Sequence, residues 1–316
     1  MATRTPPEYP DSMATLTRQS DGRSVRLGGT TTVGRTPTCD LTLPDPLVSG
    51  LHARISFRRG IWSIDDLRSR NGTLVNGKPL RRDKPQPLKK GDVITFGVTH
   101  QQWQVTDLAA PALFARSAEG GVVDGDELLA IPDESNPVVS IYQRADGRWV
   151  AERAGEVDVV EDGHDIAVDG VTWRVHIPDA SDETMENVDF APSPEDISLH
   201  FAVSTDEEHV ELEVRVGDRV YDLKSRTHHY FLLTLARARM TDAGDPELPP
   251  TSHGWLYQED LSRMLRMDDN AIYLAAFRAR QQLKKAGIAR SAGLIERRSG
   301  TRQLRIGVAR LHVRTI

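Results

Sequence analysis

The chain has 316 residues, of which 38% are hydrophobic and 27% charged, which indicates a globular protein with room for more than one domain. The sequence contains no apolar run near the roughly 18 residues of a membrane-spanning helix, no secretory signal in residues 1–20, and one cysteine, Cys39, which cannot form an internal disulfide. These features favour a cytoplasmic protein without membrane attachment. The net charge of −6 is segregated, because residues 120–199 hold 20 acidic and 4 basic residues while residues 258–316 hold 13 basic and 5 acidic ones. A polyanionic partner for the basic end, or attraction between the two parts, would follow from this distribution.

The first part of the chain changes character near residue 22. Residues 1–21 are polar and rich in Pro and Thr, which predicts a disordered tail. Residues 22–107 consist of short alternating runs, such as HARISF, IWSIDDL and DVITFG, separated by Gly, Pro and Asn. Strands this short and closely spaced are typical of an all-β sandwich.

Residues 115–178 repeat this pattern more weakly. The run VVSIYQRADGRWVAE parallels HARISFRRGIWSIDD, and EDGHDIAVDGVTWRV parallels KKGDVITFGVTHQQWQV. Two interpretations stay open: a degenerate second copy of the sandwich, or a strand extension packed on the first domain. If this segment is FHA-like, we expect it to be a scaffold or a docking surface. Residues 179–197 are acidic and contain Pro, which predicts a linker.

The last part, residues 198–316, combines strands with helices. Three strands are followed by the apolar helix HYFLLTLARARM, for which Ser225 or Thr227 offers an N-cap. A second helix, QEDLSRMLRM, and a third, AIYLAAFRARQQLKKAG, precede a hairpin that turns at Ser299-Gly300. This order predicts an α+β winged helix-turn-helix domain with an N-terminal sheet, so the whole chain is expected to be multidomain.

A set of short motifs occurs in a fixed order within residues 34–97. The motifs are Gly34-Arg35, Ser49-Gly50-Leu51-His52, Ser69-Arg70-Asn71-Gly72-Thr73, Asn76-Gly77, and Gly91-Asp92 followed by Phe96-Gly97. In this order they resemble the forkhead-associated (FHA) family over about 80 residues, which implies a phosphothreonine-binding sandwich. Its structural motif residues would be Gly34, His52, Gly72, Asn76 and Gly77.

The resemblance assigns roles that the chemistry of a phosphate ester explains. A phosphothreonine carries nearly two negative charges and three acceptor oxygens, which an arginine binds through charge-assisted hydrogen bonds. Arg35 would take this role, Ser49 would add a hydroxyl donor, and Asn71 would hold the peptide main chain. Arg70 would contact the phosphate or the residues that follow it, and His52 would brace the loop of Ser49.

One position departs from the FHA pattern, and the sequence offers little support for a catalytic or metal site. Gly50 stands where the family usually has a polar or basic residue, which removes one phosphate contact. Ser49 and His52 lack an acidic third member and a nucleophile elbow, so we predict no enzyme activity. Cys39 is expected to be a small half-buried hydrophobe. His228-His229 has no partner at metal-ligand spacing and is expected to act in polar capping, so no metal and no cofactor are predicted.

Residues 199–316 resemble the OmpR/PhoB-type effector domains of response regulators. The resemblance implies that the third helix enters the major groove of duplex DNA. Helical spacing places Ile272, Ala276, Ala279 and Leu283 on one buried face. The DNA-binding candidates on the helix and the hairpin are Arg278, Arg280, Gln281, Gln282, Lys285, Arg297, Arg298 and Arg302.

These features lead to two hypotheses about function. The first is a transcriptional regulator that reads a phosphothreonine on a partner, made by a Ser/Thr protein kinase, and couples it to DNA binding. The second is a phospho-dependent adaptor whose winged helix binds protein. Thr184, flanked by acidic residues, is a candidate phosphorylation site within the linker.

Overall fold

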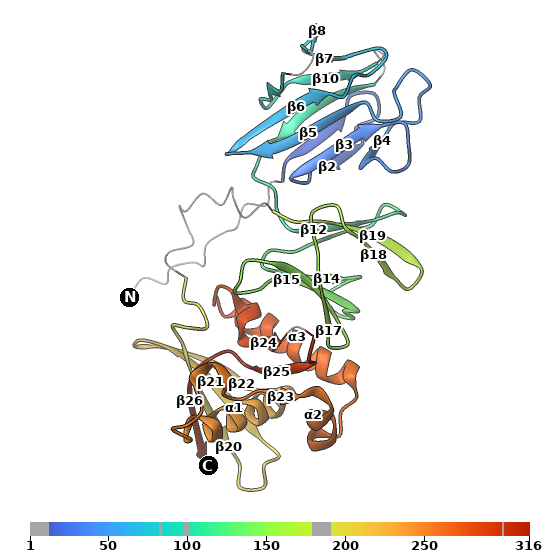
Figure 1. Ribbon diagram of the computed structural model, residues 1–316. Helices are drawn as coiled ribbons and strands as arrows, with labels where there is room; N and C mark the ends of the chain where they lie inside the picture. Colours follow the sequence, from blue (N-terminus) through green and yellow to red (C-terminus); the bar gives the residue numbers. More distant parts are fainter. Residues whose placement is uncertain (1–12, 82–83, 98–100, 179–190, 299) are drawn as a thin grey trace. The chain divides into compact units, whose positions relative to one another are not determined.

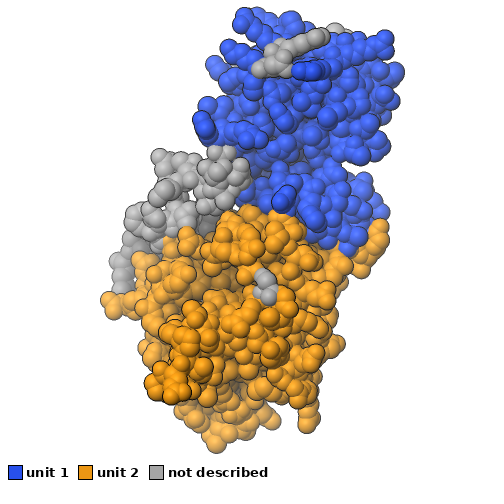
Figure 2. All heavy atoms as spheres, in the orientation of Figure 1, with its two compact units in different colours: residues 1–122, 161–167, 171–184 blue, residues 123–160, 168–170, 185–316 orange. Residues whose placement is uncertain are grey.

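The computed structural model describes residues 13–81, 84–97, 101–178, 191–298 and 300–316 (Figure 1). The chain divides into two compact units, which Figure 2 colours separately. Unit 1 comprises residues 1–122, 161–167 and 171–184, and unit 2 comprises residues 123–160, 168–170 and 185–316. Thr184 and most of the predicted linker lie outside the described residues. No helix in the part of the chain that the structure describes is long and apolar enough to span a membrane.

The first half of unit 1 is a β-sandwich, as predicted. One sheet has the order β2-β1-β11-β10-β7-β8. Its strands are β1 (Thr15–Arg18), β2 (Ser24–Arg26), β7 (Thr73–Val75), β8 (Lys78–Pro79), β10 (Val93–Phe96) and β11 (Gln102–Asp107). The other sheet, with the order β4-β3-β5-β6-β9, contains β3 (Thr30–Gly34), β4 (Leu41–Thr42), β5 (Ala53–Arg58), β6 (Ile61–Asp66) and β9 (Gln86–Pro87). Alternate residues of both sheets, among them Leu16, Ile55, Ile64 and Trp103, are buried in one core.

The tail predicted over residues 1–21 is wrong for its second half. Residues 15–18 form β1, which pairs with both β2 and β11. Ala14 and Leu16 are buried in the sandwich core. This strand was missed because its alternating pattern is only a few residues long and follows a polar segment.

Residues 114–176 form two more sheets. One has the order β13-β12-β19-β18 and contains β12 (Phe114–Ser117), β13 (Val122–Asp124), β18 (Asp165–Val168) and β19 (Val171–His176). The other has the order β14-β15-β16-β17 and contains β14 (Leu128–Ile131), β15 (Val139–Gln143), β16 (Trp149–Arg153) and β17 (Glu156–Val159). The first order parallels β2-β1-β11-β10 of the sandwich, and the second parallels β3-β5-β6-β9. This strand order supports the interpretation as a degenerate second copy, which stays a prediction.

The C-terminal part of unit 2 contains the predicted strands, helices and hairpin. The helices are α1 (His229–Ala243), α2 (Gln258–Leu265) and α3 (Asp269–Lys285), together with the short 3-10 helices η2 (Pro250–Ser252) and η3 (Ser291–Leu294). One sheet has the order β22-β21-β20-β26 and contains β20 (Ser198–Val203), β21 (Val210–Val216), β22 (Arg219–Ser225) and β26 (Arg310–Thr315). The other, β23-β25-β24, contains β23 (Leu256–Tyr257), β24 (Ile295–Arg298) and β25 (Gln303–Ile306). Strand β26, which pairs in parallel with β20, was not anticipated.

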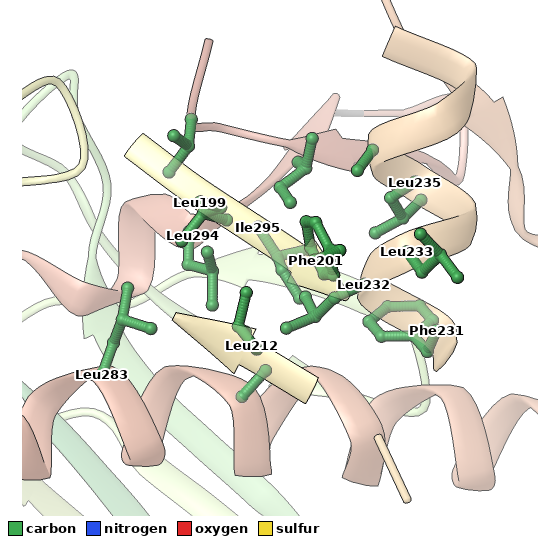
Figure 3. Packing of buried hydrophobic residues seen from close by; sticks show 14 of the residues in the cluster. Leu199, Phe201, Leu212, Phe231, Leu232, Leu233, Leu235, Leu283, Leu294 and Ile295 are labelled. Carbon is green, nitrogen blue, oxygen red and sulfur yellow. The ribbon is translucent and has the colours of Figure 1, made fainter. Parts of the chain in front are cut away.

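Apolar side chains from the helices and both sheets make the core of this part. Figure 3 shows Phe201 and Leu212 from the larger sheet, Phe231 and Leu235 from α1, and Leu283 from α3 within one cluster. Burial of this cluster explains why these helices form despite their modest length.

The ends of two helices test the capping predictions. At the start of α3, the N-cap is Asp268, whose carboxylate accepts a hydrogen bond from the Ala271 N–H at 2.7 Å. The caps proposed for α1, Ser225 and Thr227, are wrong, because the N-cap is His228, whose side chain makes no capping hydrogen bond.

Candidate functional site

Two loops of the sandwich are drawn together at the end of β3. The Arg35 N–H donates to the Ser49 carbonyl at 2.9 Å, and the Arg35 Nε donates to the Val48 carbonyl at 3.3 Å. A Cβ atom on Gly34 would lie 2.2 Å from the Gly50 carbonyl oxygen, so only glycine permits this approach. The side chain of Arg35 is exposed and that of Ser49 is half-buried. These contacts hold the backbone of Arg35, whose side chain is exposed, against the backbone of Ser49.

His52 fixes the loop that carries Ser49. Its Nδ1 accepts from the Ser49 N–H at 3.0 Å, and its Nε2 lies 3.1 Å from the Gly72 carbonyl oxygen, to which a protonated Nε2 donates. The ring is fully buried and packs edge-on against Phe96. Burial lowers the pKa of His52 below its usual 6.5, so the neutral tautomer with Nε2 protonated satisfies both contacts.

A third loop, between β6 and β7, completes the exposed face. The Ser49 Oγ accepts from the Arg70 N–H at 3.0 Å, which leaves the hydroxyl proton of Ser49 available for another acceptor. The side-chain amide of Asn71 donates to the Leu47 carbonyl at 2.7 Å. Arg70 and Asn71 are both exposed. Arg35, Ser49, Arg70 and Asn71 therefore lie on three loops joined by hydrogen bonds.

Asp66 holds the loop between β6 and β7, and the sequence analysis missed it. It accepts hydrogen bonds from the Ser69 N–H at 2.8 Å, the Ser69 hydroxyl at 2.6 Å and the Thr73 hydroxyl at 2.6 Å. Burial raises the pKa of Asp66, but the hydrogen bonds from Ser69 and Thr73 outweigh it and lower the pKa below its usual value. The available signal was an acidic residue three positions before the motif serine.

Asn76 and Gly77 lie at a separate turn, between β7 and β8. The amide of Asn76 donates to Asp92 at 2.8 Å, and its carbonyl oxygen accepts from the Val93 N–H at 2.9 Å. Both turn residues have positive φ angles, 52° for Asn76 and 74° for Gly77. These residues tie β7 to β10 and take no place on the exposed face.

The structure places two of the DNA-binding candidates in the interior of unit 2. Arg280 is fully buried, and its Nη1 lies 2.7 Å from Glu152 Oε2. The Nε of Arg297 lies 2.6 Å from Glu152 Oε1, and the Tyr142 hydroxyl donates to Glu152 Oε2 at 2.7 Å. Surface positions had been expected for Arg280 and Arg297, and this expectation is wrong, because an acidic residue of β16 lies opposite them.

The remaining candidates differ in exposure and partners. Gln282 is half-buried, and its side-chain carbonyl oxygen lies 2.8 Å from His228 Nε2 and 2.9 Å from His229 Nε2 at the start of α1. Gln281 donates to Glu134 at 2.6 Å, and Lys285 lies 3.9 Å from the same carboxylate. The other three are exposed: Arg278, Arg298 beside the Trp255 ring, and Arg302, which pairs with Asp269 at 2.6 Å.

Helix α3 is buried on two sides rather than one. Tyr273 and Phe277 are each 1% exposed, and Phe277 packs with Tyr142 and Val150 of the β14–β17 sheet. They lie outside the face predicted to be buried. Two aromatic residues four positions apart on a supposed solvent face were a signal of this second contact. Among the described residues, no group of three or more His, Cys, Asp and Glu side chains is placed to hold a metal ion.

Comparison with known proteins agrees with the geometry of the sandwich. The family model of the FHA domain matches residues 31–97, and this part of the chain is an FHA domain. The match covers the loops of Arg35, Ser49, Arg70 and Asn71.

Curated relatives match about a fifth to a quarter of the chain. The chain is similar to the DNA damage response protein kinase DUN1 of Saccharomyces cerevisiae, with 40% identity over 75 residues, 21% of this chain and 14% of that one. It is also similar to the oxoglutarate dehydrogenase inhibitor of Corynebacterium efficiens, with 39% identity over 83 residues, 26% of this chain and 54% of that one. The chain thus spans between about a seventh and about half of the length of these relatives.

Two solved structures each match 31% of the chain. One comes from a study of phosphothreonine-dependent FHA domain interactions, with 32% identity, 31% of this chain and 99% of that chain covered, and a TM-score of 0.28. The other is Mycobacterium tuberculosis EmbR in complex with a low affinity phosphopeptide, with 29% identity, 31% of this chain and 25% of that chain covered, and a TM-score of 0.29.

Proposed function

We propose that this chain is a signalling protein whose FHA domain binds phosphothreonine peptides. One observation carries the proposal: the exposed guanidinium of Arg35 and the hydroxyl of Ser49 lie on loops that the hydrogen bond between Arg35 N–H and Ser49 O joins at 2.9 Å. FHA domains are phosphopeptide-binding modules, and residues 31–97 match their family model. The partner is therefore a protein phosphorylated on threonine by a Ser/Thr kinase.

The residues of the site contact different parts of the phosphopeptide. Arg35 provides charge-assisted hydrogen bonds to a phosphate that carries nearly two negative charges. Ser49, whose Oγ already accepts from the Arg70 N–H, turns its own proton toward a phosphate oxygen. The side-chain nitrogen of Asn71 donates to the Leu47 carbonyl. The side-chain oxygen of Asn71 accepts a hydrogen bond from a main-chain N–H of the peptide. None of these steps breaks or forms a covalent bond, which fits a binding module.

Calorimetry on the full chain tests the proposal. A library of phosphothreonine peptides is titrated into the wild type, with unphosphorylated peptides as the ligand control. Arg35→Ala removes a hydrogen-bonded charge worth about 1.5–3 kcal/mol, so we expect Kd to rise about 10- to 150-fold. Arg58→Ala, a matched change at an exposed residue of β5, should leave Kd unchanged. Absence of binding by every phosphopeptide, or equal Kd for Arg35→Ala and the wild type, would refute the assignment.

Duplex DNA binding by residues 198–316 is a second candidate function. The observation that favours it is the element order, in which a sheet, α1, α2, α3 and the β24–β25 hairpin follow one another as in a winged helix. The burial of Arg280 and Arg297 removes both from a DNA-contacting role in this conformation. We propose that any phosphate contacts come from the exposed Arg278, Arg298 and Arg302.

An adaptor whose C-terminal part binds protein is the alternative. The contact between α3 and the β14–β17 sheet favours it, because the side of α3 that carries Tyr273 and Phe277 is already occupied by protein. An electrophoretic shift assay over a range of salt concentrations separates the two. Affinity for duplex DNA that falls steeply with salt supports DNA binding, since phosphate contacts release counterions. No shift at low salt supports the adaptor.

A further inference from the structure

The loop that follows Arg35 receives hydrogen bonds from the β13-β12-β19-β18 sheet as well as from the FHA sandwich. Arg174 of β19 donates from Nη1 to the Thr38 carbonyl at 3.0 Å and to Asp40 Oδ1 at 3.1 Å. Arg116 of β12 donates to the Asp40 carbonyl at 3.2 Å and to the Arg26 carbonyl at 2.8 Å. All of these residues belong to unit 1. Residues outside the matched FHA segment therefore hold residues 38–40, three to five positions after Arg35.

The edge of β3, which ends at Gly34, is completed by side chains rather than by a strand. Strand β4 pairs only with Val33 and Gly34. Further back along β3, the Thr32 N–H donates to Asp40 Oδ2 at 2.7 Å, and the Thr30 N–H donates to Asp162 Oδ2 at 3.2 Å. The carboxylates of Asp40 and Asp162 thus accept hydrogen bonds from N–H groups on a strand edge that β4 does not cover. Asp162 lies outside the FHA sandwich, in the segment between β17 and β18.

The guanidinium of Arg174 is itself held in place. Its Nε and Nη2 each donate to the Asp165 carboxylate at 2.8 Å, which leaves Nη1 for the loop. Such a bidentate pair fixes the plane of the guanidinium as well as its position. Close packing near this contact adds rigidity, because a Cβ atom on Gly28 would lie 2.2 Å from the His176 ring at the end of β19.

The hydrogen bonds continue from Arg174 to the loop of Ser49. The Thr38 hydroxyl donates to the Thr36 hydroxyl at 3.1 Å, and Thr36 donates to the Gly50 carbonyl from its hydroxyl at 2.9 Å and from its N–H at 3.1 Å. The Arg35 N–H, one residue earlier, donates to the Ser49 carbonyl at 2.9 Å. Residues 35–40 are therefore held at one end by Ser49 and Gly50 and at the other by Arg174.

From this geometry we propose that Arg174 is a positioning residue of the phosphopeptide site, and that the β12–β19 sheet acts as a brace which sets the affinity of the FHA domain. The inference rests on the proposed function. A loop that is ordered before binding loses less conformational entropy when it closes on a ligand. Without Arg174 the loop keeps its contacts to Ser49 and Gly50 and the hydrogen bonds of Asp40 to Arg116 and Thr32, but Thr38 and Asp40 lose the Arg174 anchor, so binding would have to order more of residues 36–40.

The experiment uses the full chain and two measurements. Calorimetry gives Kd for a phosphothreonine peptide with the wild type, Arg174→Ala and Arg174→Lys. The control is Arg148→Ala, which removes an arginine paired with an aspartate, Asp146, at 2.7 Å in unit 2. Amide hydrogen exchange of residues 36–40 in the free protein reports loop order directly. We expect Arg174→Ala to raise Kd about three- to tenfold and to accelerate exchange in residues 36–40, with Arg174→Lys between it and the wild type.

The two measurements separate this inference from the proposed function. If the wild type binds and Arg35→Ala does not, while Arg174→Ala binds like the wild type, the positioning role is overturned and the proposed function stands. Weaker binding of Arg174→Ala with unchanged exchange in residues 36–40 also overturns it. If no phosphopeptide binds the wild type, the proposed function fails, and exchange alone decides whether Arg174 orders the loop. A general loss of stability would accelerate exchange throughout the sandwich, whereas a positioning role confines the change to this loop.

Discussion

Replacing Glu152 by alanine should strongly destabilise unit 2. Its carboxylate lies 2.7 Å from Arg280 and 2.6 Å from Arg297, and the relative exposures of the Glu152, Arg280 and Arg297 side chains are 0%, 0% and 4%. The alanine would leave two cations in a low-dielectric interior with no carboxylate between them. Removing one partner of a buried ion pair costs about 3–5 kcal/mol, and we expect the loss in this range.

A matched set of variants separates the charge effect from general disruption. Glu156→Ala removes an exposed glutamate of the neighbouring strand β17, and we expect it to change stability by less than about 0.5 kcal/mol. Replacing Glu152, Arg280 and Arg297 together by methionine removes all three charges at once. This triple variant should be less destabilised than Glu152→Ala, because no unpaired charge remains buried.

Denaturant unfolding combined with amide exchange in β16 and α3 gives the measurement. Exchange at these elements reports unit 2 separately from the FHA sandwich, which matters because a chain with two units need not unfold in one step. A Glu152→Ala variant within about 1 kcal/mol of the wild type would refute the reasoning. So would a triple methionine variant that is less stable than Glu152→Ala.

The same carboxylate predicts how stability depends on pH. Burial raises the pKa of Glu152, but the charges of Arg280 and Arg297 and their hydrogen bonds outweigh it and lower the pKa to about 2, against 4.5 for a free glutamate. A lowered pKa means that the unfolded chain binds the proton more readily. The contribution of Glu152 is therefore fully present above pH 4.5 and is lost as the pH falls toward 2. The wild type should lose more stability over this interval than the triple methionine variant.

Two further predictions concern the FHA domain. Gly34→Ala would bring a Cβ atom to 2.2 Å from the Gly50 carbonyl oxygen and 2.8 Å from the Cys39 sulfur, so we expect the loops to separate and phosphopeptide binding to be lost, as calorimetry would show. Binding equal to that of the wild type would contradict this. Burial lowers the pKa of His52 from 6.5, so its protonation opposes folding, and stability should fall as the pH drops below about 6.5. His52→Gln, which cannot titrate, should weaken this dependence in thermal unfolding curves, and an unchanged dependence would show that His52 is not its source.

Much of the FHA site could be read from the sequence because its parts are local. Gly34 ends β3 and permits the close approach to Gly50, and Gly72 has the positive φ angle that the loop between β6 and β7 requires. The sequence could not reveal that Ser49 Oγ accepts from the Arg70 N–H across 21 residues, or that Asp66 ties the loop. Such contacts depend on how two separate loops meet in space.

The C-terminal part shows where sequence reasoning reached its limit. The spacing of apolar residues predicted the helices and the inner face of α3, since a helix repeats every 3.6 residues. Arg280 was expected to contact DNA, and therefore to lie on the surface, because an arginine is almost never fully buried unless it is paired. The partner of Arg280 is Glu152, which is 128 residues away in the sequence, so no local pattern could indicate the pairing.

By itself, the sequence determined most of the strands and helices in their order, the glycine-dependent turns and the charged groups available for phosphate binding, because each follows from a few neighbouring residues. Only the tertiary structure decided that Arg35 and Ser49 are neighbours, that Arg174 of β19 holds the loop of residues 36–40, and that Arg280 is buried. Those outcomes require segments far apart in the chain to meet. Burial and electrostatic pairing act between whatever groups the fold brings together, regardless of their separation in sequence.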